Sequence, residues 1–149
     1  MSIEIKVFEK KDISKKYVEW LQDKELTKYT EINQPSLKSI KEYVNLNIND
    51  TSVDFWKIVV KNRIHIGNIR VKYLKNSIAT IGILIGDKNY KNKGLGDKSL
   101  KMALSTLKLK KIKKIYAYIN KKNEPSIKIF KKNGFKLSKQ STEKYILNL

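Results

Sequence analysis

Eight consecutive residues near the middle of the chain read Tyr90-Lys91-Asn92-Lys93-Gly94-Leu95-Gly96-Asp97. They follow the apolar run 81–85, which is typical of a buried strand, and precede an amphipathic run over 99–107. This order predicts a strand, a glycine-containing turn and the start of a helix. Glycine lets a ligand approach the backbone, and the first helical N–H groups lack partners inside the helix. With two lysines beside it, the turn favours an anion such as phosphate, although a packing turn with solvated lysines has the same pattern.

The chain of 149 residues suits one domain, expected over 1–149, and is long enough to bury a core. It has no cysteine and a single histidine, His65. Disulfides, cysteine nucleophiles and thiolate or multi-histidine metal sites are therefore excluded, and no metal is expected. The first residues lack the apolar core of a signal peptide, and no run approaches the ~20 apolar residues of a membrane helix. We therefore expect a cytoplasmic protein with no membrane partner.

The formal net charge is +19, from 33 basic and 14 acidic residues. Such an excess suggests anionic partners, with nucleic acid the first candidate. However, lysines occur in every segment, and arginine, which is preferred for bidentate contacts, appears only at Arg63 and Arg70. We therefore expect no dedicated nucleic-acid partner. A basic nucleic-acid-binding module remains the alternative from another class, and its binding would weaken steeply with salt.

The hydrophobic periodicity predicts an alternation of strands and helices in one domain. Strands are expected over 3–7, 55–60, 64–73, 78–85, 115–119, 135–137 and 142–149. Helices are expected to begin near Asp12, Ser36, Gly94 and Asn123, with a short helix or turn around 26–29. A change of apolar phase across Gly67-Asn68 indicates a bulge. The fold class is therefore α+β with a mostly antiparallel sheet.

The order of these elements and two glycine-containing blocks resemble the GNAT acyl-CoA N-acetyltransferase superfamily over essentially the whole chain. Residues 91–96 resemble the family motif Arg/Gln-x-x-Gly-x-Gly/Ala, with Lys91 where arginine or glutamine is usual, and a second block, 123–135, resembles the N-x-x-S…K-x-G-F signature. Residues 20–29 and 65–69 resemble the Rim-type branch, which includes ribosomal-protein, polyamine and nucleotide-sugar acetyltransferases. The resemblance implies a GNAT-like single domain with a central mixed sheet of about seven strands flanked by helices.

The resemblance also implies that acetyl-CoA is the acetyl-donor cosubstrate. Backbone N–H groups over 93–96 would hold its pyrophosphate, Lys91 would supply charge, and the edge of 83–85 would pair with the pantetheine arm like an added strand. Asn123 would hydrogen-bond the cofactor near its pantetheine. The expected cofactor-binding residues are Ile83, Leu84, Ile85, Lys91, Asn92, Lys93, Gly94, Leu95, Gly96, Asn123 and Ser126.

The implied reaction is direct attack of a primary amine on the thioester. An N–H near Leu84 or Ile85 would stabilise the oxyanion. Phe130 stands where many relatives have a tyrosine that protonates the thiolate, so Ser126 or a water must serve. Thr80 stands where relatives often have a glutamate, so Glu31 or a water chain must take the amine proton. The candidate catalytic residues are therefore Glu31, Leu84 and Ser126.

The acceptor pocket of this superfamily forms between the first helical region and the strands facing the thioester. Its candidate residues here are Tyr29, Glu31, Trp56 and Tyr73. A polyamine would need several carboxylates, and residues 26–49 offer only Glu31 and Glu42. A nucleotide-linked amino sugar suits a basic protein with aromatic residues better, and a protein N-terminus of the ribosomal type is the alternative. We expect Asp97 to face away from the phosphate, His65 to be an exposed or a packing residue, and Phe130 to be a core aromatic. The protein is expected to be a monomer or homodimer.

Overall fold

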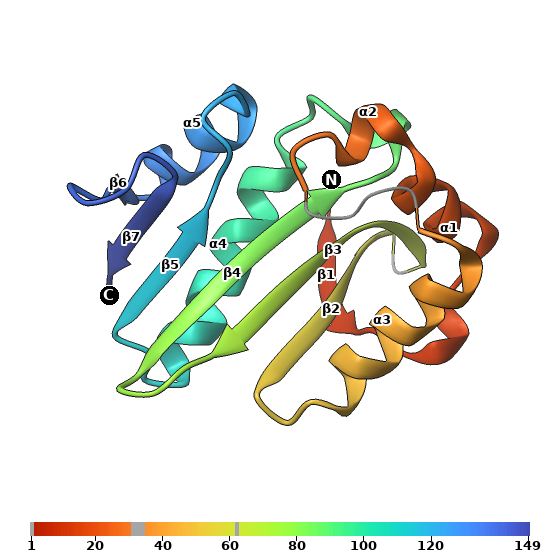
Figure 1. Cartoon of the computed structure of the whole chain (residues 1–149), viewed down its shortest axis with the longest axis horizontal. Coiled ribbons are helices and arrows are strands. Elements are labelled where there is room, and N and C mark those ends of the chain that lie inside the picture. The colour runs from red at the N-terminus through yellow and green to blue at the C-terminus, as the bar shows by residue number, and fades with distance from the viewer. Residues whose placement is uncertain (1, 31–34, 62) are drawn as a thin grey trace.

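The strands form one mixed sheet in the computed structural model, which describes residues 2–30, 35–61 and 63–149 (Figure 1). The strand order is β1-β2-β3-β4-β5-β7-β6. The bounds are Ile3–Val7 for β1, Val53–Val60 for β2, Ile64–Tyr73 for β3, Ile78–Ile85 for β4, Lys114–Tyr118 for β5, Lys136–Leu137 for β6 and Lys144–Asn148 for β7. Among these strands, only β4 and β5 pair in parallel. The predicted α+β class with a mostly antiparallel mixed sheet is confirmed.

The helices begin at residues whose side chains cap them. Ser36 Oγ accepts from Ser39 N at 3.1 Å, so the helix predicted from Ser36 is confirmed. The first helix was predicted to begin at Asp12, but Ser14 is its cap, because Ser14 Oγ accepts from Tyr17 N at 3.1 Å. The bounds are Lys15–Gln22 for α1, Lys24–Thr27 for α2, Leu37–Asn49 for α3, Leu95–Leu109 for α4 and Glu124–Lys132 for α5, with single 3₁₀ turns η1 at Lys10–Asp12 and η2 at Lys88–Tyr90. None of the helices described is long and apolar enough to cross a membrane.

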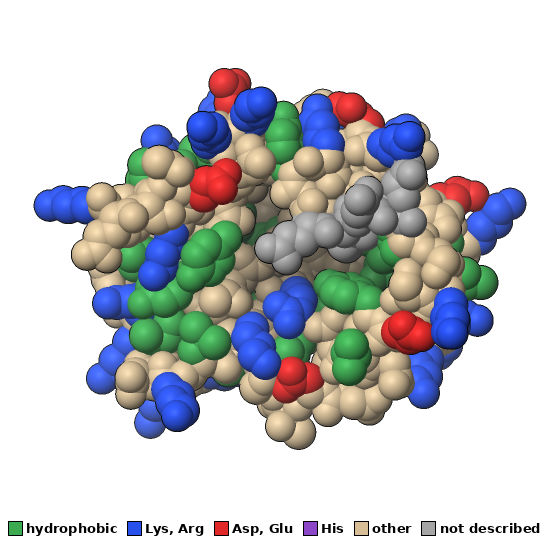
Figure 2. All heavy atoms as spheres, viewed as in Figure 1, with side chains coloured by type: hydrophobic (Ala, Val, Ile, Leu, Met, Phe, Trp, Pro, Cys, Tyr) green, Lys and Arg blue, Asp and Glu red, His purple; other side chains and the backbone are tan. Residues whose placement is uncertain are grey.

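The two faces of the sheet are covered differently. In the view of Figure 1, α3 lies in front of the sheet on the side of β2, and α4 passes behind β4. The front of β4, β5 and β7 carries no helix. Figure 2 shows the same face, with hydrophobic side chains gathered over the β5 and β7 side. One part of the sheet therefore lies open beside a part that is covered.

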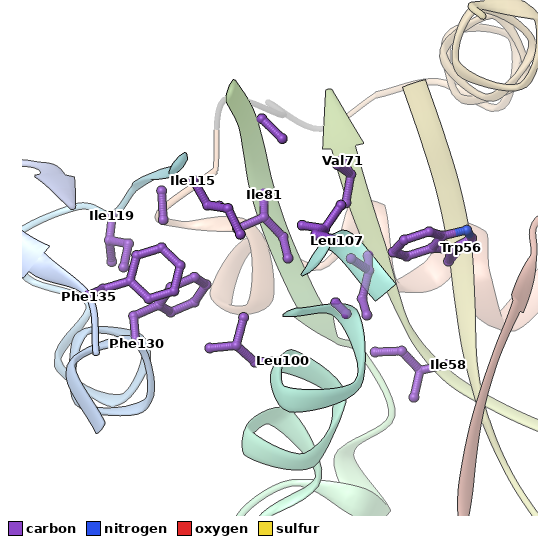
Figure 3. Close-up of a cluster of buried hydrophobic side chains, with 14 of the residues drawn as sticks. Trp56, Ile58, Val71, Ile81, Leu100, Leu107, Ile115, Ile119, Phe130 and Phe135 are labelled. Carbon is purple, nitrogen blue, oxygen red and sulfur yellow. The ribbon is translucent and has the colours of Figure 1, made fainter. Parts of the chain in front are cut away.

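Two apolar clusters fill the space between the helices and the sheet. The larger lies on the α4 side and includes Trp56, Ile58, Leu100 and Phe130 (Figure 3). The smaller joins α1 and α3 to Phe8, Val53 and Phe55. Strand β2 contributes to both clusters because successive side chains point to opposite faces.

The predicted bulge is present, one residue before its expected position. The β2–β3 register passes from Ile58 opposite Gly67 to Val59 opposite His65, so Ile66 is the extra residue in β3. Gly67 is needed here for close strand approach, because a Cβ built on it would lie 2.2 Å from the Leu84 carbonyl oxygen.

Candidate active site

Strands β4 and β5 separate halfway along β4. The parallel register joins residues 78–80 to 114–116 and goes no further. On its other side, β4 stays paired with β3 as far as Ile85. Residues 81–85 therefore present an edge that has no strand partner among the described residues. An unpaired edge of this kind can accept an extended ligand as an added strand.

The ladder with β3 decides which backbone groups reach the free edge. Gly86 N–H donates to the Ile66 carbonyl at 2.8 Å, and Leu74 N–H donates to the Ile78 carbonyl at 2.7 Å. The antiparallel alternation then turns Leu84 toward β3 and turns Ile83 and Ile85 toward the free edge. The prediction that the Leu84 N–H stabilises the oxyanion is therefore corrected, because that N–H faces the β3 ladder. The neighbouring candidate, Ile85, has the required direction.

A pocket of about 580 Å³ opens where the strands separate. Its floor is the front of β3 and β4, formed by Asn68, Arg70, Thr80, Ile81, Gly82, Ile83 and Leu84. The side under the first helices and α3 is formed by Tyr17, Leu21, Tyr29, Thr30, Tyr43 and Phe55. The opposite side is formed by Tyr118, Ile119, Asn120, Asn123, Ser126 and Phe130. Five predicted site residues thus meet in one pocket: Tyr29, Ile83, Leu84, Asn123 and Ser126.

Two predicted acceptor residues lie elsewhere. Trp56 is 8% exposed and packs in the cluster on the α4 side of the sheet (Figure 3). Tyr73 packs against the same cluster, and its hydroxyl donates to Asp54 Oδ2 at 2.5 Å. Because strand side chains alternate, both residues face away from the pocket side of the sheet. Trp56 and Tyr73 are therefore not among the residues that can contact an acceptor in this pocket. Glu31 lies outside the described residues, so its role stays a prediction.

The polar face of β3 was not predicted from the sequence. Ile69 and Val71 are fully buried, while Asn68 and Arg70, which alternate with them, line the pocket. Reading the period-2 phase of this strand from Ile69 would have separated the two sets. Tyr43 and Gly82 were also missed, since neither belongs to a motif.

Arg70 is held in place by a buried asparagine. Its Nε donates to Asn47 Oδ1 at 2.7 Å, and Asn47 Nδ2 donates to the Tyr43 carbonyl at 2.9 Å. Asn47 is only 5% exposed. Among the pocket residues that the structure describes, Arg70 is the one basic side chain, and none is acidic. The pocket therefore combines several aromatic side chains with one fixed positive charge.

The turn before α4 is anchored by contacts with α1. The Trp20 ring packs on Gly86, where a Cβ would lie 2.1 Å from the ring. Lys16 Nζ lies 2.6 Å from Asp87 Oδ2, and Asp87 Oδ1 accepts from Asn89 N at 3.0 Å. These contacts fix the start of the loop that leads into α4.

The end of this loop has the geometry expected for an anion site. Gly94 is the N-cap of α4 with a left-handed φ of 75°, and a Cβ built on it would meet nothing within 4 Å. The first intrahelical bond runs from Lys98 N to the Gly94 carbonyl at 3.1 Å. The N–H groups over 95–97 therefore have no partner in the helix, and open space lies in front of the N-cap.

Asp97 faces away from this space, as predicted. Its carboxylate lies 2.8 Å from Lys101 Nζ and 3.2 Å from Lys132 Nζ, and it accepts from Asn133 Nδ2 at 2.7 Å. The hydrogen bonds from Lys101 and then Asn133 lower its pKa to about 2. Asp97 therefore joins α4 to α5.

The family of this chain is shown by its similarity to known proteins. Residues 3–136 match the family model described as the acetyltransferase (GNAT) domain. The chain belongs to the GNAT family. Acetyl-CoA is the acetyl donor of GNAT enzymes, so the loop and the free strand edge have an expected occupant.

Two relatives come from Methanocaldococcus jannaschii. The uncharacterized protein MJ1062 is 32% identical over 127 residues, which are 83% of this chain and 26% of that protein. This GNAT domain thus spans about a quarter of the length of that relative. The crystal structure of a domain from the same organism is 28% identical with a TM-score of 0.84, over 99% of both chains.

More distant structures share the GNAT fold. Aminoglycoside acetyltransferase AAC(6')-Ib in complex with coenzyme A has a TM-score of 0.85 at 17% identity, covering 99% of this chain and 95% of that one. Spermidine N-acetyltransferase from Vibrio cholerae in complex with CoA and spermine has a TM-score of 0.85 at 15% identity, covering 98% and 95%. At these identities the likeness establishes the fold alone.

Two predicted packing residues in this GNAT domain are confirmed as such. Phe130 is 4% exposed and packs edge-on against Phe135, with ring centroids 5.0 Å apart. His65 contacts the rings of Phe8, Tyr17 and Trp20, and it does not line the pocket. Burial lowers the pKa of His65. Phe130 borders the pocket but carries no exchangeable proton, and His65 lies outside the pocket lining, so neither residue exchanges a proton with a substrate there.

Proposed function

We propose that this domain transfers the acetyl group of acetyl-CoA to the primary amine of a nucleotide-linked amino sugar. The main support for acetyl transfer is the separation of β4 from β5. It leaves a free strand edge between the α4 N-terminus and the pocket. This arrangement suits a long ligand with an anionic end at the helix and a reactive end in the pocket.

The cofactor would lie along this edge. The N–H groups over 95–97 and the loop before them would hold the pyrophosphate, with Lys91 and Lys93 adding charge. The backbone of Ile83 and Ile85 would pair with the amide groups of the pantetheine arm. Asn123 Oδ1 accepts from Ser126 N at 3.4 Å, which leaves the Asn123 NH₂ group able to donate to the same arm.

The chemistry then needs few protein groups. The amine nitrogen forms a bond to the thioester carbon, and the carbonyl oxygen becomes an oxyanion that the N–H of Ile83 or Ile85 stabilises. The carbon–sulfur bond breaks, and the CoA thiolate takes a proton from Ser126 or water. The nitrogen loses its proton to water or, if Glu31 reaches the pocket, to that carboxylate.

The pocket residues favour a weakly basic amine. Burial raises the pKa of Tyr17 and of Tyr43, so neither phenol acts as a base near neutral pH. No carboxylate or histidine is found among the described lining residues. An amino sugar suits such a site, because its neighbouring oxygens withdraw electrons and leave part of the amine neutral without a strong base.

Charge in the pocket favours an acceptor that carries a negative group. Arg70 would repel a polycation and attract a phosphate. Tyr29, Tyr43 and Phe55 supply flat apolar surfaces for a sugar or a base. A peptide N-terminus remains the alternative acceptor, and the experiment below separates the two.

The test is an acetylation assay on the purified domain with acetyl-CoA and four acceptors: a nucleotide-linked amino sugar, the same amino sugar without its nucleotide, spermidine and a ribosomal N-terminal peptide. Release of the CoA thiol gives the rate, and mass spectrometry identifies the acetylated product. We expect the highest kcat/KM for the nucleotide-linked sugar. A higher kcat/KM for spermidine or for the peptide would overturn the proposed acceptor.

A further inference from the structure

Gly82 has no structural reason to be a glycine. It lies in the middle of β4, it is exposed, and a Cβ built on it would meet nothing within 4 Å. Its φ is not positive, unlike that of Gly94 and Gly134. By contrast, a Cβ on Gly67 or Gly86 would collide with its neighbours. A glycine inside a strand weakens that strand, and it often marks a place where a ligand approaches the backbone closely.

The bare backbone of Gly82 lies between two side chains on the same face of the sheet. On β3, Arg70 is directly opposite Gly82 in the register. On β5, Tyr116 pairs with Thr80, so Tyr118 stands at the level of Gly82 where the strands have begun to separate. All three residues line the pocket, and Tyr118 is 64% exposed. A strip without side chains thus crosses β4 between a guanidinium and a phenol ring.

The guanidinium at one end of this strip is fixed, and no described acidic side chain neutralises it. Its Nε is occupied by Asn47, which leaves both terminal nitrogens to donate to a ligand. Within the described parts of the chain, no acidic side chain forms an ion pair with Arg70. Asp50 borders an adjoining hollow with Arg70, but it is engaged by Lys72 Nζ at 3.0 Å and by Ser52 Oγ at 2.6 Å.

We propose that the acceptor crosses β4 over Gly82, with a phosphate on Arg70 and its amine at the free edge beside Ile83. This inference rests on the proposed acetyl transfer and adds the acceptor's position and the group that selects it. Neighbouring strands lie about 4.8 Å apart, a span that one sugar ring can bridge. A terminal guanidinium group binds phosphate through two parallel hydrogen bonds, so Arg70 selects phosphorylated amines.

The first test compares Arg70→Gln with Lys72→Gln. Lys72 is two residues along the same strand, carries the same charge and does not line the pocket. Arg70→Gln should raise KM for the nucleotide-linked amino sugar at least about tenfold, as expected for a lost charge-assisted bond. The same variant should leave KM for acetyl-CoA and for the free amino sugar within about twofold of the parent values. Lys72→Gln should leave KM for all substrates within about twofold of the parent values. Equal effects of Arg70→Gln on the two sugars would overturn the proposal.

The second test places a side chain on the bare backbone at Gly82. Gly82→Val should fold normally, because valine suits a strand and its Cβ meets open space. It should lower kcat/KM for every acceptor at least about tenfold, while acetyl-CoA binds as tightly as in the parent protein. Unchanged acceptor kinetics in Gly82→Val would show that the acceptor does not cross here.

A binding measurement separates failure of this inference from failure of the proposed function. The CoA-saturated domain is titrated with uridine diphosphate, and the Arg70→Gln variant serves as the comparison. Binding that the variant loses supports the subsite even if no nucleotide-linked sugar is acetylated. Acetylation of such a sugar with no dependence on Arg70 would keep the proposed function and reject the subsite. If the unaltered domain does not bind uridine diphosphate at millimolar concentration, the subsite is also rejected.

Discussion

Single residues in this domain owe their roles to the direction in which a strand or helix turns them. Arg70 reaches the pocket because Ile69 and Val71 face α4, and buried Asn47 then fixes its guanidinium. Asp97 is in the first turn of α4, yet it points to α5 and not to the space in front of the N-cap. A carboxylate in this turn therefore strengthens the helix start without repelling an anion there.

Replacing Asp97 should make this contribution measurable. In Asp97→Asn we expect a loss of about 1 kcal/mol in the free energy of unfolding at pH 7, because two ammonium groups lose their carboxylate. The folded pKa of about 2 is below the ordinary value of 3.8, so this stability is present above pH 4 and is lost as the pH falls toward 2. Urea unfolding from pH 7 to pH 2.5 measures it.

The control for Asp97 is Glu25→Gln. Glu25 pairs with Lys28 on the surface, where its side chain is 80% exposed, so we expect a change below about 0.5 kcal/mol. A difference between Asp97→Asn and the parent protein that stays constant down to pH 2.5 would contradict the assignment.

At the scale of elements, α1 supports the loop that precedes α4. Trp20 fills the space above Gly86, and the Lys16–Asp87 ion pair lies beside it. On the other side of the loop, a Cβ on Gly96 would lie 3.3 Å from Ile129 of α5. The proposed pyrophosphate site is thus positioned by contacts with both α1 and α5.

Two glycines of the same stretch should respond in opposite ways to alanine. Gly86→Ala forces a methyl group into the Trp20 ring, and we expect a loss of about 1–3 kcal/mol in the free energy of unfolding, together with weaker acetyl-CoA binding as the loop moves. Gly82→Ala meets open space, so its stability should be unchanged or slightly higher. Thermal unfolding and acetyl-CoA titration of both variants check this, and equal destabilisation would contradict the packing described.

The elements were predictable where the signal is local. Ser36 as a cap and the apolar run of β4 each act within a few residues. The placement of Trp56 and Tyr73 was not predictable from local signals. Their residue types suggested a binding role, but the pairing of β2 and β3 decides which face of the sheet each side chain occupies. The direction of the Leu84 N–H likewise depends on the register with β3, which no single segment encodes.

At the scale of the whole molecule, the domain combines a covered half and an open half of one sheet. Figure 2 shows Lys and Arg side chains distributed around this face and not gathered into one patch. The net charge of +19 therefore provides a general attraction for anionic ligands such as CoA.

Acetyl-CoA is proposed to bind with its pyrophosphate at the start of α4. Calorimetric titration with acetyl-CoA tests this directly, on the nucleic-acid-free domain and on Gly94→Trp and Asn76→Trp. Both positions have positive φ, but Asn76 lies in the turn at the far end of β4. We predict one site per chain in the parent protein and in Asn76→Trp, and at least about a tenfold loss of affinity in Gly94→Trp. No binding by the parent protein, or equal binding by both variants, would contradict the account.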